Sequence, residues 1–470
     1  MMCARAPIES AHELVEQHQP PEVHGYAFEP MRIGRTERGH GRGMGGRLQR
    51  NRNPWIYLPS VTPAIQEAVL ITRAEDSNRR AYRLSSIDVV RGLVIVIMAI
   101  DHVRDYFNIG GEVDPMANPR ISAALFFTRW ITHYCAPVFV FLAGTSAGLM
   151  TARKSQAAMA AFLFKRGAWL ILIEWFVIST AWSFAPWGLE PFGGRVGVVM
   201  QVIWVIGASM IVLAGAQCFG QRVCLVTGAA ILVCHNLLDS VWPATSGITD
   251  TAHPWWVALH AQMAVASGPF FFLIPYPLLP WIGVMLMGYG TAPLFQQPAA
   301  RRNARLLAFG MTATAAFAAL RATGVYGEPN PWQIQDTPIA TLIDFLNVTK
   351  YPPSLLFLLM TLGPAAIFCA HADRVPDVIK RPLIVFGRAP FAFYVAHLYL
   401  IHGLAVALGI IRGFDASAFL TYGFFFPEGY GIGLPGTYLV WGLVIAMLYP
   451  LCRWVASVKS RRHDWWLSYL

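Results

Sequence analysis

Apolar runs long enough to cross a bilayer recur along the chain from about residue 80 onward, and shorter polar segments separate them. A membrane-spanning helix needs about 20 predominantly apolar residues. Such runs predict ten spanning helices, near residues 87–108, 129–150, 166–186, 196–216, 221–240, 268–292, 303–323, 353–371, 384–411 and 434–456. The expected fold is therefore all-α, a polytopic membrane bundle of about ten transmembrane helices.

The segment before these runs has a different pattern. Residues 1–80 include an Arg- and Gly-rich stretch, MRIGRTERGHGRGMGGRLQRNRN, and contain no apolar run of the length that a secretory signal needs. We predict that residues 1–80 form a disordered cytoplasmic tail and that residues 81–470 form the transmembrane domain. Contact of the tail with lipid or nucleic acid is the alternative interpretation.

Composition and charge agree with a membrane protein. Hydrophobic residues make up 55% of the chain and charged residues 13%, about half the charged fraction of a soluble domain. The loops on one side of the predicted bundle carry about twice as many Lys and Arg residues as those on the other, which places both termini in the cytoplasm of a multi-pass protein of the inner (plasma) membrane. The net charge of +10 is explained by this bias and by contact with the lipid bilayer, so no nucleic-acid partner is expected.

One predicted span carries charged residues at membrane depth. In IDVVRGLVIVIMAIDHVRDYFN (87–108), Arg91 and His102 lie three helical turns apart on one face, with Asp88 one turn before Arg91 and Asp105 one turn after His102. Lipid does not accept such a stripe, so it must face the bundle interior or a water-filled cavity. Charged groups in this position usually mark a pathway or a reaction site.

The depth of these groups suggests two separate roles. Asp88 and Arg91 lie at the cytoplasmic mouth of the span, whereas Asp101 and His102 lie in its outer half, where His133 of the next predicted helix reaches a similar depth. A buried neutral imidazole is a suitable general base, and a neighbouring carboxylate orients it. We predict His102 and His133 as catalytic, with Asp101 orienting His102. Interhelical packing is the alternative for each histidine.

Weaker candidates lie elsewhere. Tyr351 ends an outer loop before two prolines, and Tyr394 lies one turn before His397 in a later span. Together with Asp105 these residues are predicted to bind the substrate, although a plain helix start and structural histidines explain them as well. The seven cysteines form no close pair, and no zinc signature, Walker loop or GxGxxG fingerprint is present, so neither a metal nor a soluble-type nucleotide site is expected.

A series of sequence blocks carries a family resemblance. They occur in the order RLSSIDVVRGLVIVIMAIDHVRDYF, HYCAPVFVFLAGTSAGL, PYPLLPWIGVMLMGY, KYPPSLLFLLMTLGP, GRAPFAFYVAHLYLIH and YPLCRWVASVKSRRHDWWLSYL. Over about residues 82–470 the chain resembles the bacterial membrane family related to the catalytic domain of heparan-α-glucosaminide N-acetyltransferase.

The resemblance implies an acyltransferase. Acetyl-CoA from the cytoplasm is then the acyl donor, and an amine or hydroxyl of a sugar on the far side of the membrane, in a cell-envelope glycan, is the acceptor. By position, His102 takes the place of an asparagine that assists catalysis in the lysosomal enzyme, and His133 is the nearest candidate for its reactive histidine. Arg91 and Asp88 then belong to the donor site.

Two other functions remain open from the sequence. A proton-coupled transporter or exporter uses buried Asp and His residues as a relay, but it usually carries an internal inverted repeat, which the two halves of this chain lack. A scaffold subunit with a degenerate site is the third alternative. The sequence is silent on the acceptor and on oligomeric state, so a homo-oligomer also remains open.

Overall fold

The computed structural model describes residues 63–109, 121–240, 254–261, 263–462, 464 and 467. The tail predicted for residues 1–80 lies outside the described residues up to residue 62, so its disorder stays a prediction. From Pro63 the chain is helical, which places the start of regular structure well before residue 81. A search for apolar runs misses this first part of the helix because it is rich in Ala, Glu, Gln and Arg, which favour helices without being apolar.

The described regular elements are mostly helices. They are α1 (Pro63–Phe107), α2 (Ala123–Thr132), α3 (Cys135–Met150), α4 (Gln156–Ile173), a π-helical turn η2 (Glu174–Ile178), α5 (Ser179–Ser183), β1 (Val196–Val199), α6 (Val202–Ala216), α7 (Gln221–Cys234), α8 (Pro254–His260), β2 (Met263–Ser267), β3 (Phe270–Ile274), α9 (Leu278–Gly290), α10 (Ala299–Thr323), α11 (Pro338–Leu346), α12 (Leu355–His371), α13 (Asp377–Arg388), α14 (Pro390–Ile411) and α15 (Leu434–Arg461). Short 3₁₀ turns connect several of these elements, among them η5 (His235–Ser240).

The helical membrane bundle expected from the sequence is confirmed. Within the described part of the chain, eight helical segments are long and apolar enough to cross a membrane. They are Ala123–Met150, Val202–Phe219, Gln221–Asp239, Leu278–Gln296, Ala299–Thr323, Leu355–Arg374, Pro390–Ile411 and Leu434–Arg461.

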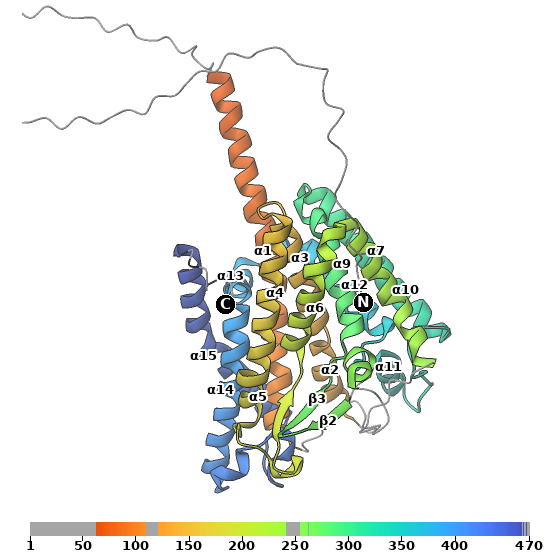
Figure 1. Cartoon of the computed structure of the whole chain (residues 1–470), viewed down its shortest axis with the longest axis vertical. Coiled ribbons are helices and arrows are strands. Elements are labelled where there is room, and N and C mark those ends of the chain that lie inside the picture. The colour runs from red at the N-terminus through yellow and green to blue at the C-terminus, as the bar shows by residue number, and fades with distance from the viewer. Residues whose placement is uncertain are drawn as a thin grey trace, which may run out of the picture. The chain divides into compact units, whose positions relative to one another are not determined.

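Two further helical segments match the remaining predicted spans although they carry more charge. The second half of α1 packs against α3, α13, α14 and α15, and α4 packs along α6. Figure 1 shows α1 and α4 running among the other long helices. Several of these charges face the bundle interior, among them Asp88 and Arg91 of α1 and Arg166 of α4, whereas Lys165 of α4 is exposed.

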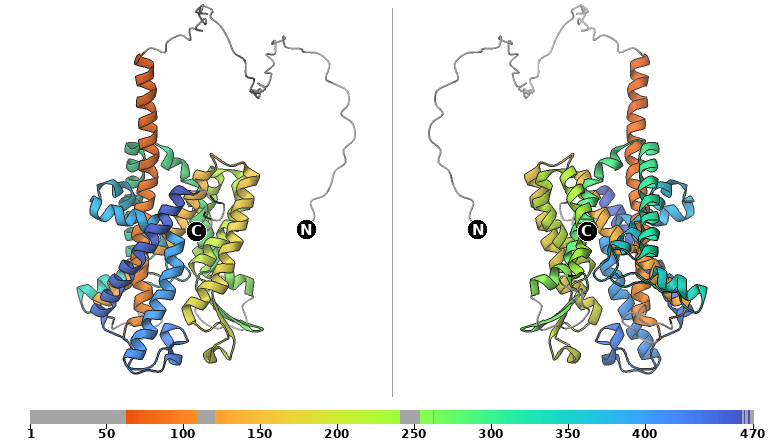
Figure 2. Two further views of the ribbon diagram at one scale, coloured as in Figure 1. Left: turned by 90° about the vertical axis from the view of Figure 1, so that its left-hand side faces the viewer. Right: turned by 90° about the vertical axis from the view of Figure 1, so that its right-hand side faces the viewer.

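A small β-sheet corrects two of the predicted spans. Strand β3 pairs with β1 in parallel and with β2 antiparallel, so that α6 and α9 begin only after these strands. The sheet lies at the end of the bundle opposite the first turns of α1 (Figures 1 and 2). Apolar strands such as VGVV and FFFLI cannot be distinguished by hydropathy from the start of a spanning helix, which is why the runs at 196–216 and 268–292 are predicted as helix throughout.

Glycines allow the helices around the site to approach closely. A side chain at Gly144 would collide with the carbonyl oxygen of Met285 and one at Gly148 with that of Tyr289, so the GxxxG spacing of these two glycines brings α3 close to α9. In the same way α1 approaches α13 at two points, since a side chain at Gly92 would meet backbone of Leu383 and one at Gly387 would meet backbone of Asp88. This second contact holds α1, near Asp88, against the end of α13.

Candidate functional site

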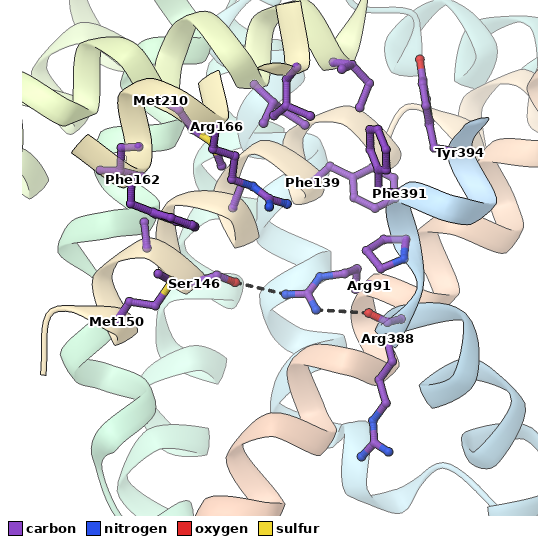
Figure 3. Close-up of a pocket in the computed structure, with 18 of the residues that line it drawn as sticks. Arg91, Phe139, Ser146, Met150, Phe162, Arg166, Met210, Arg388, Phe391 and Tyr394 are labelled. Carbon is purple, nitrogen blue, oxygen red and sulfur yellow. Dashed lines mark hydrogen bonds between the residues drawn. The ribbon is translucent and has the colours of Figure 1, made fainter. Parts of the chain in front are cut away.

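A cavity of about 770 Å³ opens between α1, α3, α4, α6 and α14. Its wall is largely apolar, with Phe139, Phe162, Met210 and Phe391 among the side chains that face it (Figure 3). Five cationic side chains also line it, together with the single carboxylate of Asp464. The cations are Arg91, Lys154, Arg166, Arg388 and Lys459. We call this space the cationic cavity.

Arg91 is held in place from three sides. Its guanidinium donates hydrogen bonds to the Gly387 carbonyl at 3.2 Å and to Ser146 Oγ at 3.1 Å (Figure 3). It also donates a hydrogen bond to Asp88 Oδ1 at 3.1 Å. Asp88 also accepts a hydrogen bond from Arg388 Nε at 3.3 Å. Asp88 therefore positions two cations of the cavity, Arg91 and Arg388, but does not line the cavity itself.

The cationic cavity reaches Tyr394, which leads to a buried histidine. The hydroxyl of Tyr394 is buried and has no hydrogen-bond partner among the described residues. One turn later, His397 is fully buried, and its Nδ1 lies 3.1 Å from the Phe393 carbonyl and 2.5 Å from that of Tyr394. A carbonyl only accepts, so Nδ1 carries the proton and Nε2 of the neutral ring keeps a free lone pair. That Nε2 also lacks a partner within the described part of the chain.

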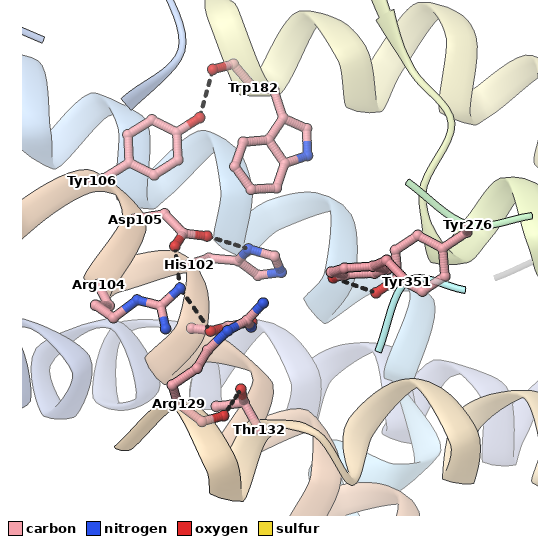
Figure 4. Close-up of polar contacts among 10 residues, drawn as sticks. His102, Arg104, Asp105, Tyr106, Arg129, Thr132, Trp182, Tyr276 and Tyr351 are labelled. Carbon is pink, nitrogen blue, oxygen red and sulfur yellow. Dashed lines mark hydrogen bonds and ion pairs between the residues drawn. The ribbon is translucent and has the colours of Figure 1, made fainter. Parts of the chain in front are cut away.

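His397 brings the cavity into contact with His102. The centroids of the two imidazole rings are 5.1 Å apart, and the ring of Trp182 packs edge-on against His102 at 5.0 Å. The Nδ1 of His102 lies 3.8 Å from Asp105 Oδ2 (Figure 4). Tyr394, His397 and His102 thus follow one another through ring contacts from the cavity to the Asp105 carboxylate, and we call these four residues the polar row.

Asp101 does not orient His102, contrary to the sequence prediction. Its carboxylate forms ion pairs with Arg104, at 3.1 Å, and with Arg129 of α2. The carboxylate that faces the imidazole is that of Asp105, because residues three apart share a helix face whereas adjacent residues do not. Arg104 also pairs with Asp105 at 2.6 Å, so the two carboxylates and two guanidiniums neutralise one another.

His133 lies apart from this row. It is buried at the break between α2 and α3, and its ring packs against Phe357 at 5.3 Å. The ring contacts of His102 are with Trp182 and His397, so the predicted meeting of His102 with His133 is not observed. The break between α2 and α3 directs His133 toward Phe357 of α12. This break is not visible in the sequence, because one apolar run extends through both helices.

Tyr351, just before α12, faces a second tyrosine just before α9. Its hydroxyl lies 3.5 Å from that of Tyr276, and the rings contact at 5.2 Å (Figure 4). Burial raises the pKa of Tyr276 well above its usual value. Burial also acts to raise the pKa of Tyr351, but the positive charges of Lys350 and Arg129 outweigh it and lower that pKa below its ordinary value. Tyr351 is thus the more acidic phenol of the pair.

The loop that carries Tyr351 is firmly anchored. Arg321, at the end of α10, donates hydrogen bonds to four backbone carbonyls, at residues 330, 344, 345 and 347. The Glu328 carboxylate accepts hydrogen bonds from the Thr349 backbone N–H at 3.0 Å and from Ser354 Oγ at 2.7 Å. These hydrogen bonds hold the segment before α12 in a defined position beside the site.

Comparison with known families gives a match over residues 83–325, to the family described as heparan-alpha-glucosaminide N-acetyltransferase, catalytic. The chain belongs to this family. A search of curated proteins finds no match. Membership of the heparan-α-glucosaminide N-acetyltransferase family shows that the protein is a membrane enzyme of the acetyltransferase type.

The family match covers one part of the site and not another. They include the stripe of α1 with Arg91 and His102, the ion pairs around Asp101 and the break at His133. Tyr394 and His397 lie beyond the match, on α14. Within the described residues of this acetyltransferase, no group of three or more His, Cys, Asp and Glu side chains is arranged to hold a metal ion.

One buried acid of the acetyltransferase was not singled out from the sequence. Glu174 is fully buried in the π-helical turn η2, and its carboxylate accepts hydrogen bonds from the backbone N–H of Trp204 at 2.9 Å and of Gln201 at 3.3 Å. It therefore caps the first turn of α6, where Val202 and Ile203 line the cationic cavity. A carboxylate inside the apolar run ILIEWFVI was the available signal.

Proposed function

We propose that the protein transfers an acetyl group from acetyl-CoA, bound in the cationic cavity from the cytoplasmic side, to an amine or hydroxyl of a sugar on the opposite side of the membrane. One observation carries this proposal. In a chain of the N-acetyltransferase family, a cation-lined cavity leads through Tyr394 and His397 to His102. The donor and the acceptor then approach the same pair of imidazoles from opposite sides.

The composition of the cavity supports CoA as the donor. CoA carries a pyrophosphate and a 3′-phosphate, and Arg is the side chain best suited to bind phosphate in a bidentate manner. Five cations face the space and one carboxylate opposes them. The apolar wall formed by residues such as Phe139 and Phe391 suits the pantetheine arm, which would direct the thioester toward Tyr394.

The polar row supports the chemistry of transfer. The acceptor nitrogen or oxygen attacks the thioester carbonyl, its proton passes to the imidazole of His102, and the bond between the acetyl carbon and sulfur breaks as CoA leaves and takes up a proton. Asp105 stabilises the imidazolium that forms on His102. The unpaired hydroxyl of Tyr394 is suited to donate a hydrogen bond to the carbonyl oxygen as negative charge develops there.

The polar side chains on the far side of His102 support a polar acceptor. Asp105, Arg129 and Tyr351 offer charged and hydroxyl groups on the far side of His102, as sugar recognition requires. A glycan of the cell envelope is the acceptor class we favour. The Lys and Arg bias of the loops supports a position in the inner membrane with both termini in the cytoplasm.

The proposal is tested with purified protein in detergent. Calorimetry with CoA should detect binding, and incubation with acetyl-CoA and glucosamine, followed by a panel of hydroxyl sugars, should release free CoA thiol and an acetylated product visible by mass spectrometry. Membranes from cells with and without the protein, compared for acetylated envelope glycans, extend the test to the native acceptor. Protein that is folded but binds no CoA would exclude the proposal.

A proton-coupled transporter is the second candidate, because the ion pairs among Asp101, Arg104 and Arg129 and the buried imidazoles resemble a proton relay. The two functions make opposite demands on the sample. Transport needs a sealed vesicle and a proton gradient, whereas acetyl transfer proceeds in detergent. Substrate-dependent proton flux in vesicles, without any consumption of acetyl-CoA, would decide for the transporter.

A further inference from the structure

A second cavity, of about 280 Å³, lies on another side of the bundle, between α1, α3, α7, α9, α10 and α12. Its lining is almost entirely apolar, with Phe141, Leu142, Met287, Leu306 and Leu362 among the side chains that face it. We call it the apolar cavity. It shares no lining residue with the cationic cavity, so the proposed acetyl transfer does not use it.

The apolar cavity reaches the exposed apolar surface of α10, which faces lipid when that helix spans a membrane. Phe309 of α10 lines it and is still 44% exposed, and Leu307 and Met311 on either side are exposed as well. Water does not fill a space with so few polar partners, and an empty space of this size deprives its wall of dispersion contacts. The available apolar occupant in a membrane is a lipid acyl chain.

Cationic side chains precede lining residues of this cavity by one or two helical turns on α7 and α10. On α10, Arg301 and Arg305 precede Phe309 at four-residue spacing, so all three share one face. On α7, Arg222 lies one turn before Leu225, which also lines the cavity. Among the described residues, no carboxylate lies within 4.0 Å of these three guanidiniums.

An apolar space open to lipid, with unneutralised cations at one end, has the chemistry of a phospholipid site. Basic groups between transmembrane helices bind anionic headgroups, and the adjoining cavity accepts the chain. We propose that the apolar cavity holds an acyl chain of an anionic glycerophospholipid whose phosphate is bound by Arg222, Arg301 and Arg305. The site is independent of the acetyl-transfer proposal and serves to anchor α7 and α10 to one leaflet.

The test compares lipids that differ only in headgroup charge. Delipidated full-length protein in detergent is titrated with dioleoyl phosphatidylglycerol or dioleoyl phosphatidylcholine, and bound lipid is counted by native mass spectrometry while the melting temperature is followed. Phosphatidylglycerol should bind and raise the melting temperature at concentrations where phosphatidylcholine does not. Each of Arg222→Gln, Arg301→Gln and Arg305→Gln should weaken phosphatidylglycerol about fivefold. Arg462→Gln, an exposed charge at the end of α15, is the matched control.

A second variant tests the cavity itself. Ala366→Phe places a ring into the space and should abolish retention of phosphatidylglycerol, whereas Ala308→Phe, on the exposed face of α10, should not. Equal binding of the two lipids, or unchanged binding in the three arginine variants, would overturn the headgroup assignment. Unchanged retention in a folded Ala366→Phe protein would overturn the cavity assignment.

Discussion

The imidazole rings of His102 and His397 lie 5.1 Å apart, although they belong to α1 and α14 at opposite ends of the chain. Their surroundings differ. His397 has no exposed surface, and its protonated Nδ1 is fixed by backbone carbonyls, whereas His102 is partly accessible and faces the Asp105 carboxylate. Two histidines in such different environments are suited to different tasks. His102 is suited to accept a proton, and His397 is suited to hold His102 in position beside the donor cavity.

The first prediction follows from this pair. His102→Ala and His397→Ala should each lower kcat about 10²- to 10⁴-fold, the usual contribution of a positioned acid–base group, while CoA binding measured by calorimetry is retained. His371→Ala, which removes a partly exposed histidine at the end of α12, is the control and should keep full activity. Full activity in both single variants of the pair would end the assignment. His133→Ala, which lies outside the row, should lower activity less than either.

The second prediction concerns donor binding. Arg91→Lys keeps the positive charge but loses the planar fork that now holds Asp88, Ser146 and the Gly387 carbonyl together. KM for acetyl-CoA should rise by about ten- to a hundredfold with a smaller change in kcat, because the loss of a charge-assisted hydrogen bond costs about 1.5–3 kcal/mol. Steady-state kinetics at two salt concentrations measures this. Arg153→Lys, on the exposed turn after α3, is the matched control, and equal effects of the two substitutions would contradict the role of Arg91.

Much of the α1 site was predictable because one helix carries it. The stripe of Asp88, Arg91, His102 and Asp105 follows from 3.6 residues per turn, and the contact between Asp88 and Arg91 is found at 3.1 Å. The partners of that stripe were not predictable in the same way. That Asp101 pairs with Arg129 depends on how α2 packs against α1, which hydropathy does not encode.

The fold shows the same division between local and long-range information. Length and apolar character identify the spanning helices, because each must satisfy its backbone hydrogen bonds internally. The three-stranded sheet pairs residue 196 with residue 270 and depends on contacts between distant segments. The choice of His397 over His133 as the neighbour of His102 has the same origin, since the break between α2 and α3 turns His133 toward Phe357.

The third prediction uses Tyr351 and Tyr276, which meet from two different segments of the chain, before α12 and before α9. Because Lys350 and Arg129 lower the pKa of Tyr351, its phenolate forms at lower pH in the folded protein than in the unfolded chain. A depressed pKa adds stability as pH rises through the folded-state value, so the wild type should gain stability relative to Tyr351→Phe on the alkaline side. Thermal unfolding of both proteins across alkaline pH measures the difference.

Lys350→Gln provides the control for this effect. It keeps the phenol but removes the leading positive charge, so the near-ultraviolet tyrosinate signal assigned to Tyr351 should move to higher pH. Tyr276→Phe should leave that alkaline gain in stability largely in place, because burial already keeps Tyr276 protonated. Parallel pH profiles for the wild type and Tyr351→Phe would show that Tyr351 does not titrate early.

The fourth prediction concerns the buried carboxylate of Glu174. Its hydrogen bonds satisfy backbone N–H groups at the start of α6, and the side chain is fully buried there. Glu174→Ala leaves these donors unpaired and should destabilise the folded protein by about 1–3 kcal/mol, whereas Glu174→Gln keeps one acceptor oxygen and should cost less. Thermal unfolding in detergent gives the comparison, with Glu190→Ala as an exposed control.

A purely structural cap and a cap that shapes the donor site differ in their kinetics. Val202 and Ile203 of the same turn line the cationic cavity, so displacement of α6 in Glu174→Ala should also raise KM for acetyl-CoA. The assay is run at a temperature well below the melting temperature of this variant. Glu174→Gln should restore most of the affinity. If KM is unchanged while stability falls, Glu174 serves the fold alone. If KM and stability change together and Glu174→Gln rescues both, the carboxylate holds α6 in the position that the donor cavity requires. That role explains why a carboxylate lies inside an apolar run.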